Sequence, residues 1–186
     1  MPHSIEREKD LEPWFERYLW LCAQTLYDPA PQNFSVIVEN TARRVGTGKR
    51  WSRPDICLAC VSRYRYQPTP SLDLHSFELK MPDGCDMLAV HEALSHTASA
   101  HYAHLALYLP TSSENKRALA HLPDMKQQAQ RHGVGIILIG DPKDITTYER
   151  ILEARRHTPA PSHIDSFIDE RFSASNTLAL KRWVRI

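Results

Sequence analysis

Two short stretches decide the fold predicted for this chain: Arg53-Pro54-Asp55-Ile56 and Phe77-Glu78-Leu79-Lys80. The first opens a strand predicted from residue 55 to about 66, and the second closes a strand predicted from about 72 to 81. A turn that contains two Pro residues, 67–71, lies between them and favours a hairpin. In a hairpin the start of one strand lies beside the end of the next, so we expect both stretches at the same end of the sheet.

The charged residues of these stretches are predicted to converge. Side chains alternate along a strand, so Glu78 and Lys80 share one face while Phe77 and Leu79 pack on the other. Charges on a central strand are costly unless they are paired or bind a metal. Asp55 adds a second carboxylate opposite them, and Mg²⁺ binds through one or two carboxylates plus waters. The pattern predicts a Mg²⁺ or Mn²⁺ site in which Lys80 holds the attacking water or balances developing charge.

The elements around this hairpin predict an α/β fold. We expect a helix within residues 5–26, with Pro13 in the first turn of its main segment, and a strand at 34–39. Further elements are predicted as a helix at 86–104, a strand at 105–109, a helix at 113–132 and a buried strand at 134–139. The order α-β-β-β-α-β-α-β indicates a central mixed sheet flanked by helices. One domain of residues 1–186 is expected, with a core at about 5–140 and a helical C-terminal extension at 141–186.

The composition is that of a soluble globular protein without a strong overall charge. The 186 residues include 23 basic and 22 acidic side chains, so a nucleic-acid surface has to come from local clustering. We find no apolar leader and no run long enough for a membrane span, and we therefore expect a cytoplasmic protein. Cys57 and Cys60 lie three residues apart on a strand and point to opposite faces, which predicts buried thiols rather than a metal or redox pair.

The pattern P-D…E-x-K formed by Asp55, Glu78 and Lys80 resembles the PD-(D/E)XK nuclease superfamily, over about residues 5–140. The resemblance implies a restriction-endonuclease-like fold and metal-dependent phosphodiester hydrolysis, of DNA rather than RNA, in defence against foreign DNA or in repair. In that family the Asp and Glu bind Mg²⁺, the Lys assists the water, and the carbonyl of the residue between them, here Leu79, is a further ligand. The first helix often adds an acid, for which Glu8 is the first candidate and Glu12 the second. An ordinary solvated helix start explains these two acids equally well.

A basic segment precedes Asp55. It consists of Arg43, Arg44, Lys49, Arg50 and Arg53, with Trp51 among them. Such a segment is suited to grip phosphates and stack on a base, and Arg63 and Arg65 on the next strand would extend it. An ordinary solvent-exposed loop explains these basic residues equally well.

The predicted helix at 86–104 contains His91-Glu92-Ala-Leu-Ser-His96. Histidines five residues apart lie roughly 140° apart around a helix, so this is not the H-E-x-x-H site of zinc proteases. Glu92 and His96 share a face and are expected to look toward the metal site. One branch of the nuclease superfamily carries a Gln and a Tyr on this helix; Tyr102 is the candidate for the Tyr, but the Gln is missing. His101 and His104 are predicted to be packing or surface residues.

Two further classes of function stay open. The chain is alternatively a non-catalytic nucleic-acid-binding or assembly subunit with a nuclease-like fold, acting as a homodimer or with partner proteins. A metalloprotease is disfavoured by the histidine spacing. The complete set of Asp55, Glu78 and Lys80 favours the nuclease.

Overall fold

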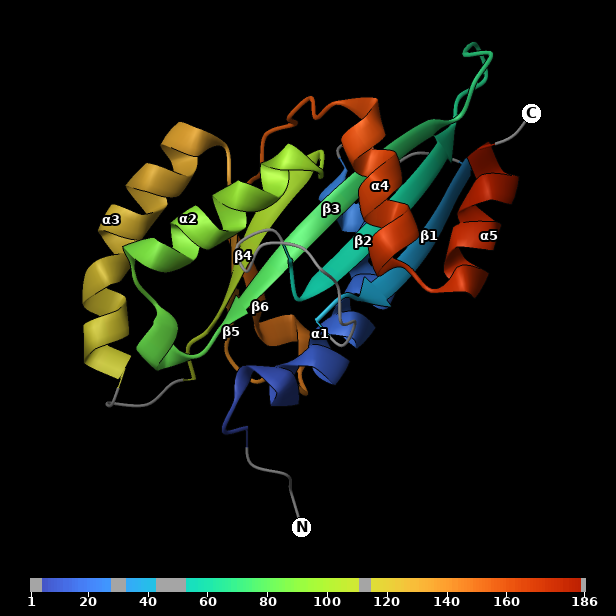
Figure 1. The fold of residues 1–186 in the computed structure, drawn as a ribbon. Helices are drawn as coiled ribbons and strands as arrows, with labels where there is room; N and C mark the ends of the chain where they lie inside the picture. Colours follow the sequence, from blue (N-terminus) through green and yellow to red (C-terminus); the bar gives the residue numbers. More distant parts are fainter. Residues whose placement is uncertain (1–4, 28–32, 43–52, 111–114, 185–186) are drawn as a thin grey trace.

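The computed structural model describes residues 5–27, 33–42, 53–110 and 115–184, and these form a six-stranded sheet covered by helices (Figure 1). The strand order is β1-β2-β3-β4-β5-β6. The first three strands are antiparallel, the middle three are parallel, and the last runs antiparallel to its neighbour. The strands are β1 (Asn33–Asn40), β2 (Ile56–Arg63), β3 (Ser71–Lys80), β4 (Tyr102–Tyr108), β5 (Gly135–Ile139) and β6 (Tyr148–Leu152). The predicted α/β class with a mixed sheet is confirmed.

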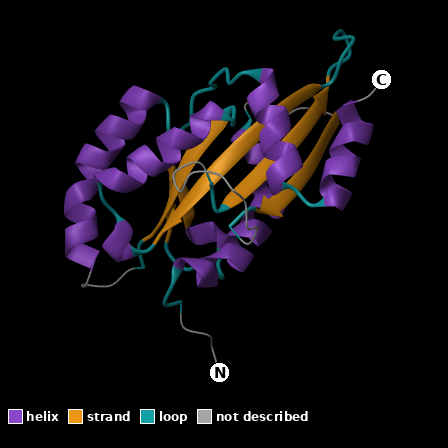
Figure 2. Ribbon diagram, viewed as in Figure 1, coloured by secondary structure: helices purple, strands orange, loops and turns teal. Residues whose placement is uncertain are grey.

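Helices cover both faces of this sheet (Figure 2). One face carries α1 (Glu8–Cys22). The other face carries two pairs, α2 (Met87–Ser95) with α3 (Lys116–His132) and α4 (Pro161–Arg171) with α5 (Ala174–Val184). Short 3₁₀ turns join the elements at Ala23–Leu26, Pro82–Gly84, His96–Ala98 and Ile145–Thr147. In the part of the chain that the structure describes, none of the helices combines the length and apolar character of a membrane span.

The apolar stripe of α1 anchors that helix to the sheet. Leu11, Phe15 and Leu19 are almost completely buried, and the ring centroids of Phe15 and Phe77 lie 5.3 Å apart. The helix begins at Glu8, so the expectation that Pro13 occupies the first turn is wrong. Pro13 lies inside the helix and has no N–H to donate to the carbonyl of Lys9, a loss that burial of the stripe offsets.

The hairpin of β2 and β3 carries the fold's central apolar residues. Ile56 pairs with Phe77, and Ser62 pairs with Ser71. The start of β2 therefore lies beside the C-terminal part of β3. Cys57 and Cys60 are fully buried in clusters on opposite faces of the sheet, as predicted. The strand ends at Arg63, earlier than expected from the aromatic residues that follow it.

Other elements also differ from prediction. The helix expected to span 86–104 ends at Ser95, and β4 begins at Tyr102, because residues from Tyr102 onward pair in parallel with β3 and are largely buried in the sheet. The tail also contributes β6, whose charged residues Glu149 and Arg150 suit an edge strand. The C-terminal segment is therefore not a helical extension beyond the sheet. It supplies one edge strand and, through α4 and α5, part of the cover of β1 and β2.

Candidate active site

Glu78 and Lys80 lie on one face of β3, as the alternation predicts. Phe77 and Leu79 are fully buried on the opposite face with α1. Glu78 is only 8% exposed, on the face that α2 covers. A carboxylate at that depth requires a counter-charge or strong hydrogen bonds.

Asp55 lies immediately before β2 and opposite Glu78. Its amide donates to the carbonyl of Phe77 at 3.0 Å, which continues the hairpin by one residue. Its Oδ2 accepts a hydrogen bond of 2.8 Å from the amide of Leu79. The backbone of β3 therefore holds the Asp55 carboxylate next to Glu78, where the hairpin prediction placed it.

The carbonyl of Leu79 faces the same side as Asp55. In a strand the N–H and C=O of one residue point toward the same neighbour. The Leu79 amide binds the Asp55 carboxylate, so the Leu79 carbonyl is also directed past the start of β2. This orientation suits the backbone ligand that the family resemblance implies.

Lys80 lies among three carboxylates. Its Nζ is 2.8 Å from Glu78 Oε1, 2.8 Å from Glu92 Oε2 and 3.7 Å from Glu8 Oε1. The Lys80 side chain is 13% exposed, so these pairs are little screened by solvent. The arrangement joins β3 to α2 on one side and to the start of α1 on the other.

Helix α2 supplies two of the groups around this lysine. Asp86 caps its first turn by accepting hydrogen bonds from the amides of Leu88 and Ala89. Glu92 then reaches Lys80, and Nε2 of His96 lies 3.6 Å from Oε2 of Glu78. The expectation that Glu92 and His96 face the site is confirmed. His91 is exposed, so the zinc-protease interpretation fails on geometry as well as on spacing.

Both acids suggested from the first helix lie near the site. Glu8 reaches Lys80, with its own side chain 43% exposed. Glu12 is buried, and its Oε2 accepts a 2.7 Å hydrogen bond from Asn40. Both act electrostatically on Asp55.

Burial and mutual repulsion set the protonation of the site. Burial and the nearby Asp55 charge raise the pKa of Glu78, against the opposing effect of Lys80, to a net value of about 8. Burial likewise raises the pKa of Asp55 to about 6, against the hydrogen bond from Leu79. Burial lowers the pKa of Lys80, but the carboxylates outweigh it and the net pKa is raised. Burial and the Lys80 charge lower the pKa of His96 to about 3, so this imidazole is neutral.

Most of the predicted basic segment lies outside the residues that the structure describes. Arg43, Arg44, Lys49, Arg50 and Trp51 lie outside the described residues, and Arg53 is exposed two residues before Asp55. Arg63 and Arg65 do not extend a phosphate surface. Arg63 ends an eight-residue strand, about 25 Å from Asp55, and donates to the carbonyl of Trp183 at 2.7 Å.

The remaining aromatic candidates have packing roles. Tyr102 begins β4 instead of lying on a helix, and it stacks on His75 with centroids 4.4 Å apart. The suggested correspondence with a helical Tyr is therefore wrong. His101 accepts a hydrogen bond from the amide of Leu74, and His104 bonds His75, both in buried positions as predicted.

Two residues that position the site were missed. Asn40 donates to Glu12 and Glu16, which fixes the end of β1 against α1. A Cβ at Gly84 would lie 3.2 Å from Cδ of Lys80, so a larger residue would press on the lysine. The sequence signal for Gly84 is its position four residues after Lys80.

The donor set suits a hard cation. Asp55 and Glu78 offer carboxylate oxygens and Leu79 a carbonyl, which together resemble the partial protein shell around Mg²⁺. Among the described residues, no preformed group of three or more His, Cys, Asp or Glu ligands is present. In this arrangement the Lys80 ammonium occupies the space among the carboxylates. Two carboxylates are nevertheless enough for an ion that keeps several waters.

Comparison with known proteins leaves the family open. No family model matches the chain, and no characterised protein matches it in sequence. Among solved structures, the SPO1766 protein of unknown function from Silicibacter pomeroyi is 14% identical, with a TM-score of 0.49. That match covers 97% of this chain and 90% of the other.

Proposed function

We propose that this protein is a metal-dependent nuclease with a restriction-endonuclease-like fold that hydrolyses phosphodiester bonds, of DNA in preference to RNA. The observation that carries the proposal is the cluster of Glu78, Glu92 and Glu8 around Lys80, with the Asp55 carboxylate acting on Glu78. When these carboxylates are ionised, the single ammonium does not neutralise them, and the cluster carries a net negative charge. A divalent cation balances such a charge, and the P-D…E-x-K pattern is where the resemblance expects one.

In this proposal each residue of the site has a separate chemical role. Asp55, Glu78 and the Leu79 carbonyl would hold Mg²⁺ or Mn²⁺, which supplies Lewis acidity and lowers the pKa of a bound water. Lys80 orients the attacking water and balances the negative charge that develops on the phosphate. Glu92 holds the Lys80 ammonium at 2.8 Å and thereby positions it. The role in defence or repair rests on the sequence resemblance.

A single set of assays tests the proposal. Plasmid, linear duplex, single-stranded DNA and RNA are incubated with the full chain in Mg²⁺, Mn²⁺ or EDTA. We expect cleavage of DNA in either metal and none in EDTA. Nucleic-acid binding without cleavage in any metal would instead support the non-catalytic binding or assembly subunit.

The pH dependence of stability gives a second test that needs no substrate. The pKa values of Glu78 and Asp55 are raised by folding, to about 8 and about 6. Between the pKa values of the unfolded chain and these raised values, the folded state binds more protons than the unfolded state. The stability of the metal-free protein therefore falls as pH rises through about 4 to 8. A bound metal ion keeps both groups ionised and removes this slope. We expect the increase in Tm caused by Mg²⁺ to grow from about pH 5 to about pH 8.

Glu78→Gln provides the control for this measurement, because other groups titrate in the same range. The variant should flatten the metal-free curve and lose the Mg²⁺ effect. A Mg²⁺ effect of equal size at both ends of the range would contradict the assignment of Glu78 as a ligand.

A further inference from the structure

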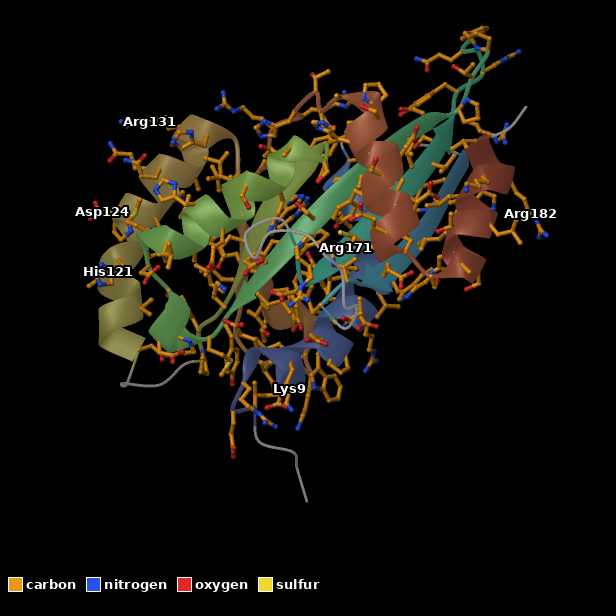
Figure 3. The ribbon with its side chains drawn as sticks, viewed as in Figure 1. Lys9, His121, Asp124, Arg131, Arg171 and Arg182 are labelled. Atoms are coloured by element: carbon orange, nitrogen blue, oxygen red, sulfur yellow. The ribbon has the colours of Figure 1, made fainter. Side chains whose placement is uncertain are left out.

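Arg171 is a buried cation for which the described residues provide no ion pair within 4.0 Å. It is the last residue of α4 and is 3% exposed. Its Nη1 is buried without a hydrogen-bond partner. Its side chain makes no ion pair or hydrogen bond in the described part of the structure. Figure 3 places it over the sheet, in contrast to Arg182 and Lys9 on the periphery.

The surroundings of Arg171 are largely apolar, and the acids nearest to it, Glu39 and Glu170, form no ion pair with it. It lies in the region of Phe167 and Phe172 in the apolar cluster under α4 and α5. The nearby acid Glu39 uses its Oε2 to cap α5, accepting from the Ser173 amide and hydroxyl and from Asn176. The end of α4 offsets part of the charge through the helix dipole. Burying the remaining charge is costly, so a ligand of opposite charge is expected.

Arg171 lies on the same face and at the same end of the sheet as Asp55. Both groups act on the thiol of Cys57, which is two residues after Asp55 on β2.

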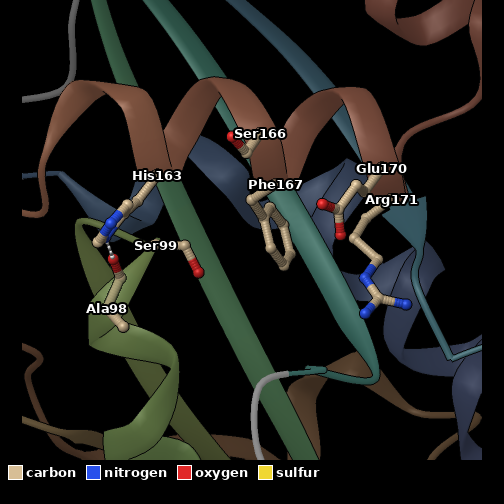
Figure 4. Close-up of a pocket in the computed structure, with 7 residues that line it drawn as sticks. All are labelled: Ala98, Ser99, His163, Ser166, Phe167, Glu170 and Arg171. Carbon is tan, nitrogen blue, oxygen red and sulfur yellow. Dashed lines mark hydrogen bonds between the residues drawn. The ribbon is translucent and has the colours of Figure 1, made fainter. Parts of the chain in front are cut away.

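A cavity of about 240 Å³ opens between α4 and the turn after α2 (Figure 4). It is smaller than a cavity that encloses a drug-sized ligand, so its size suits one phosphate group rather than a nucleotide. Hydroxyl, imidazole and guanidinium groups reach it from both sides, and the Glu170 carboxylate also lines it. Its polar lining residues are Ser99, His163, Ser166, Glu170 and Arg171.

We propose that Arg171 and this cavity form a phosphate-binding subsite that holds the backbone of a nucleic acid beside Asp55. A guanidinium matches a phosphate through two parallel hydrogen bonds, and the ligand would supply the ion pair that Arg171 lacks among the described residues. The assignment of the ligand to a nucleic acid rests on the proposed nuclease function; the need for an anion does not. The C-terminal helices thereby contribute to substrate binding.

Arg171→Met tests this subsite in binding experiments with a labelled duplex oligonucleotide in EDTA, where no cleavage is needed. We expect affinity to fall about tenfold and the salt slope to shrink by about 0.9. The Tm of the variant should rise, because an uncompensated buried charge is replaced by an apolar side chain. Arg171→Lys keeps the charge and should retain the salt slope while still binding more weakly.

Arg182→Met is the matched control, since it removes the same charge from an exposed position on α5. It should leave affinity, slope and Tm near the wild type. Wild-type affinity in Arg171→Met would overturn the subsite, as would a much lower Tm, which would reveal a structural partner. If inorganic phosphate stabilises the wild type through Arg171 while oligonucleotide affinity is unchanged in the variant, the ligand is free phosphate and the backbone proposal is wrong. Failure of the nuclease proposal would appear separately, as absent cleavage in metal.

Discussion

Asp55→Asn should reduce metal-dependent cleavage by about two to three orders of magnitude while leaving the fold intact. The amide oxygen of Asn can still accept the hydrogen bond from the Leu79 amide, so the end of the hairpin keeps its geometry. What the substitution removes is the negative charge that a cation requires. Because burial raises the pKa of Asp55 to about 6, a neutral side chain is favoured there. Above that pH, the metal-free variant should melt no lower than the wild type.

Calorimetric titration with Mn²⁺ checks this mechanism independently of activity. Asp55→Asn should bind the ion more weakly, whereas Asp124→Asn, an exposed change on α3, should bind and cleave like the wild type. Undiminished cleavage by Asp55→Asn would remove Asp55 from the metal site. Lost cleavage with unchanged Mn²⁺ affinity would assign Asp55 a role other than metal binding.

The charged cluster was predictable because its geometry is local. Strand alternation alone puts Glu78 and Lys80 on one face, and one hairpin places Asp55 beside them. Glu92 and His96 followed from their helical spacing. Each of these inferences depends only on the spacing of residues within one helix or strand, or on the pairing of two adjacent strands.

Features set by distant parts of the chain were not predictable in the same way. β6 is a short edge strand with charged residues, and only its pairing with β5 identifies it. The end of α2 at Ser95 depends on where β4 must begin beside β3. Arg171 looks like any helix-terminal arginine in the sequence; its burial becomes visible only when α4 is packed on the sheet.

Lys80→Met should abolish cleavage and, without metal, lower stability by about 3–5 kcal/mol. The substitution leaves Glu78 and Glu92 close together with no ammonium between them. For a chain of this length the loss corresponds to a fall of roughly 10 °C in Tm in EDTA. Mg²⁺ should restore much of that Tm, because a bound cation replaces the missing positive charge, but it cannot replace the group that orients the water. Thermal melts in EDTA and in Mg²⁺, beside a cleavage assay, measure both effects.

The double variant Lys80→Met/Glu92→Gln separates the two roles of the lysine. If the stability loss comes from unpaired carboxylates, removing the Glu92 charge should recover part of the Tm in EDTA, as expected for residues in direct contact. Cleavage should stay absent, because Glu92 only positions the ammonium. Glu92→Gln alone should keep Lys80 beside Glu78 and lose about tenfold to a hundredfold in rate, the usual effect of a supporting contact. A Lys80→Met protein that melts low in EDTA and gains nothing from Mg²⁺, beside a wild type that cleaves no nucleic acid, would make the cluster a structural ion-pair network and overturn the nuclease proposal.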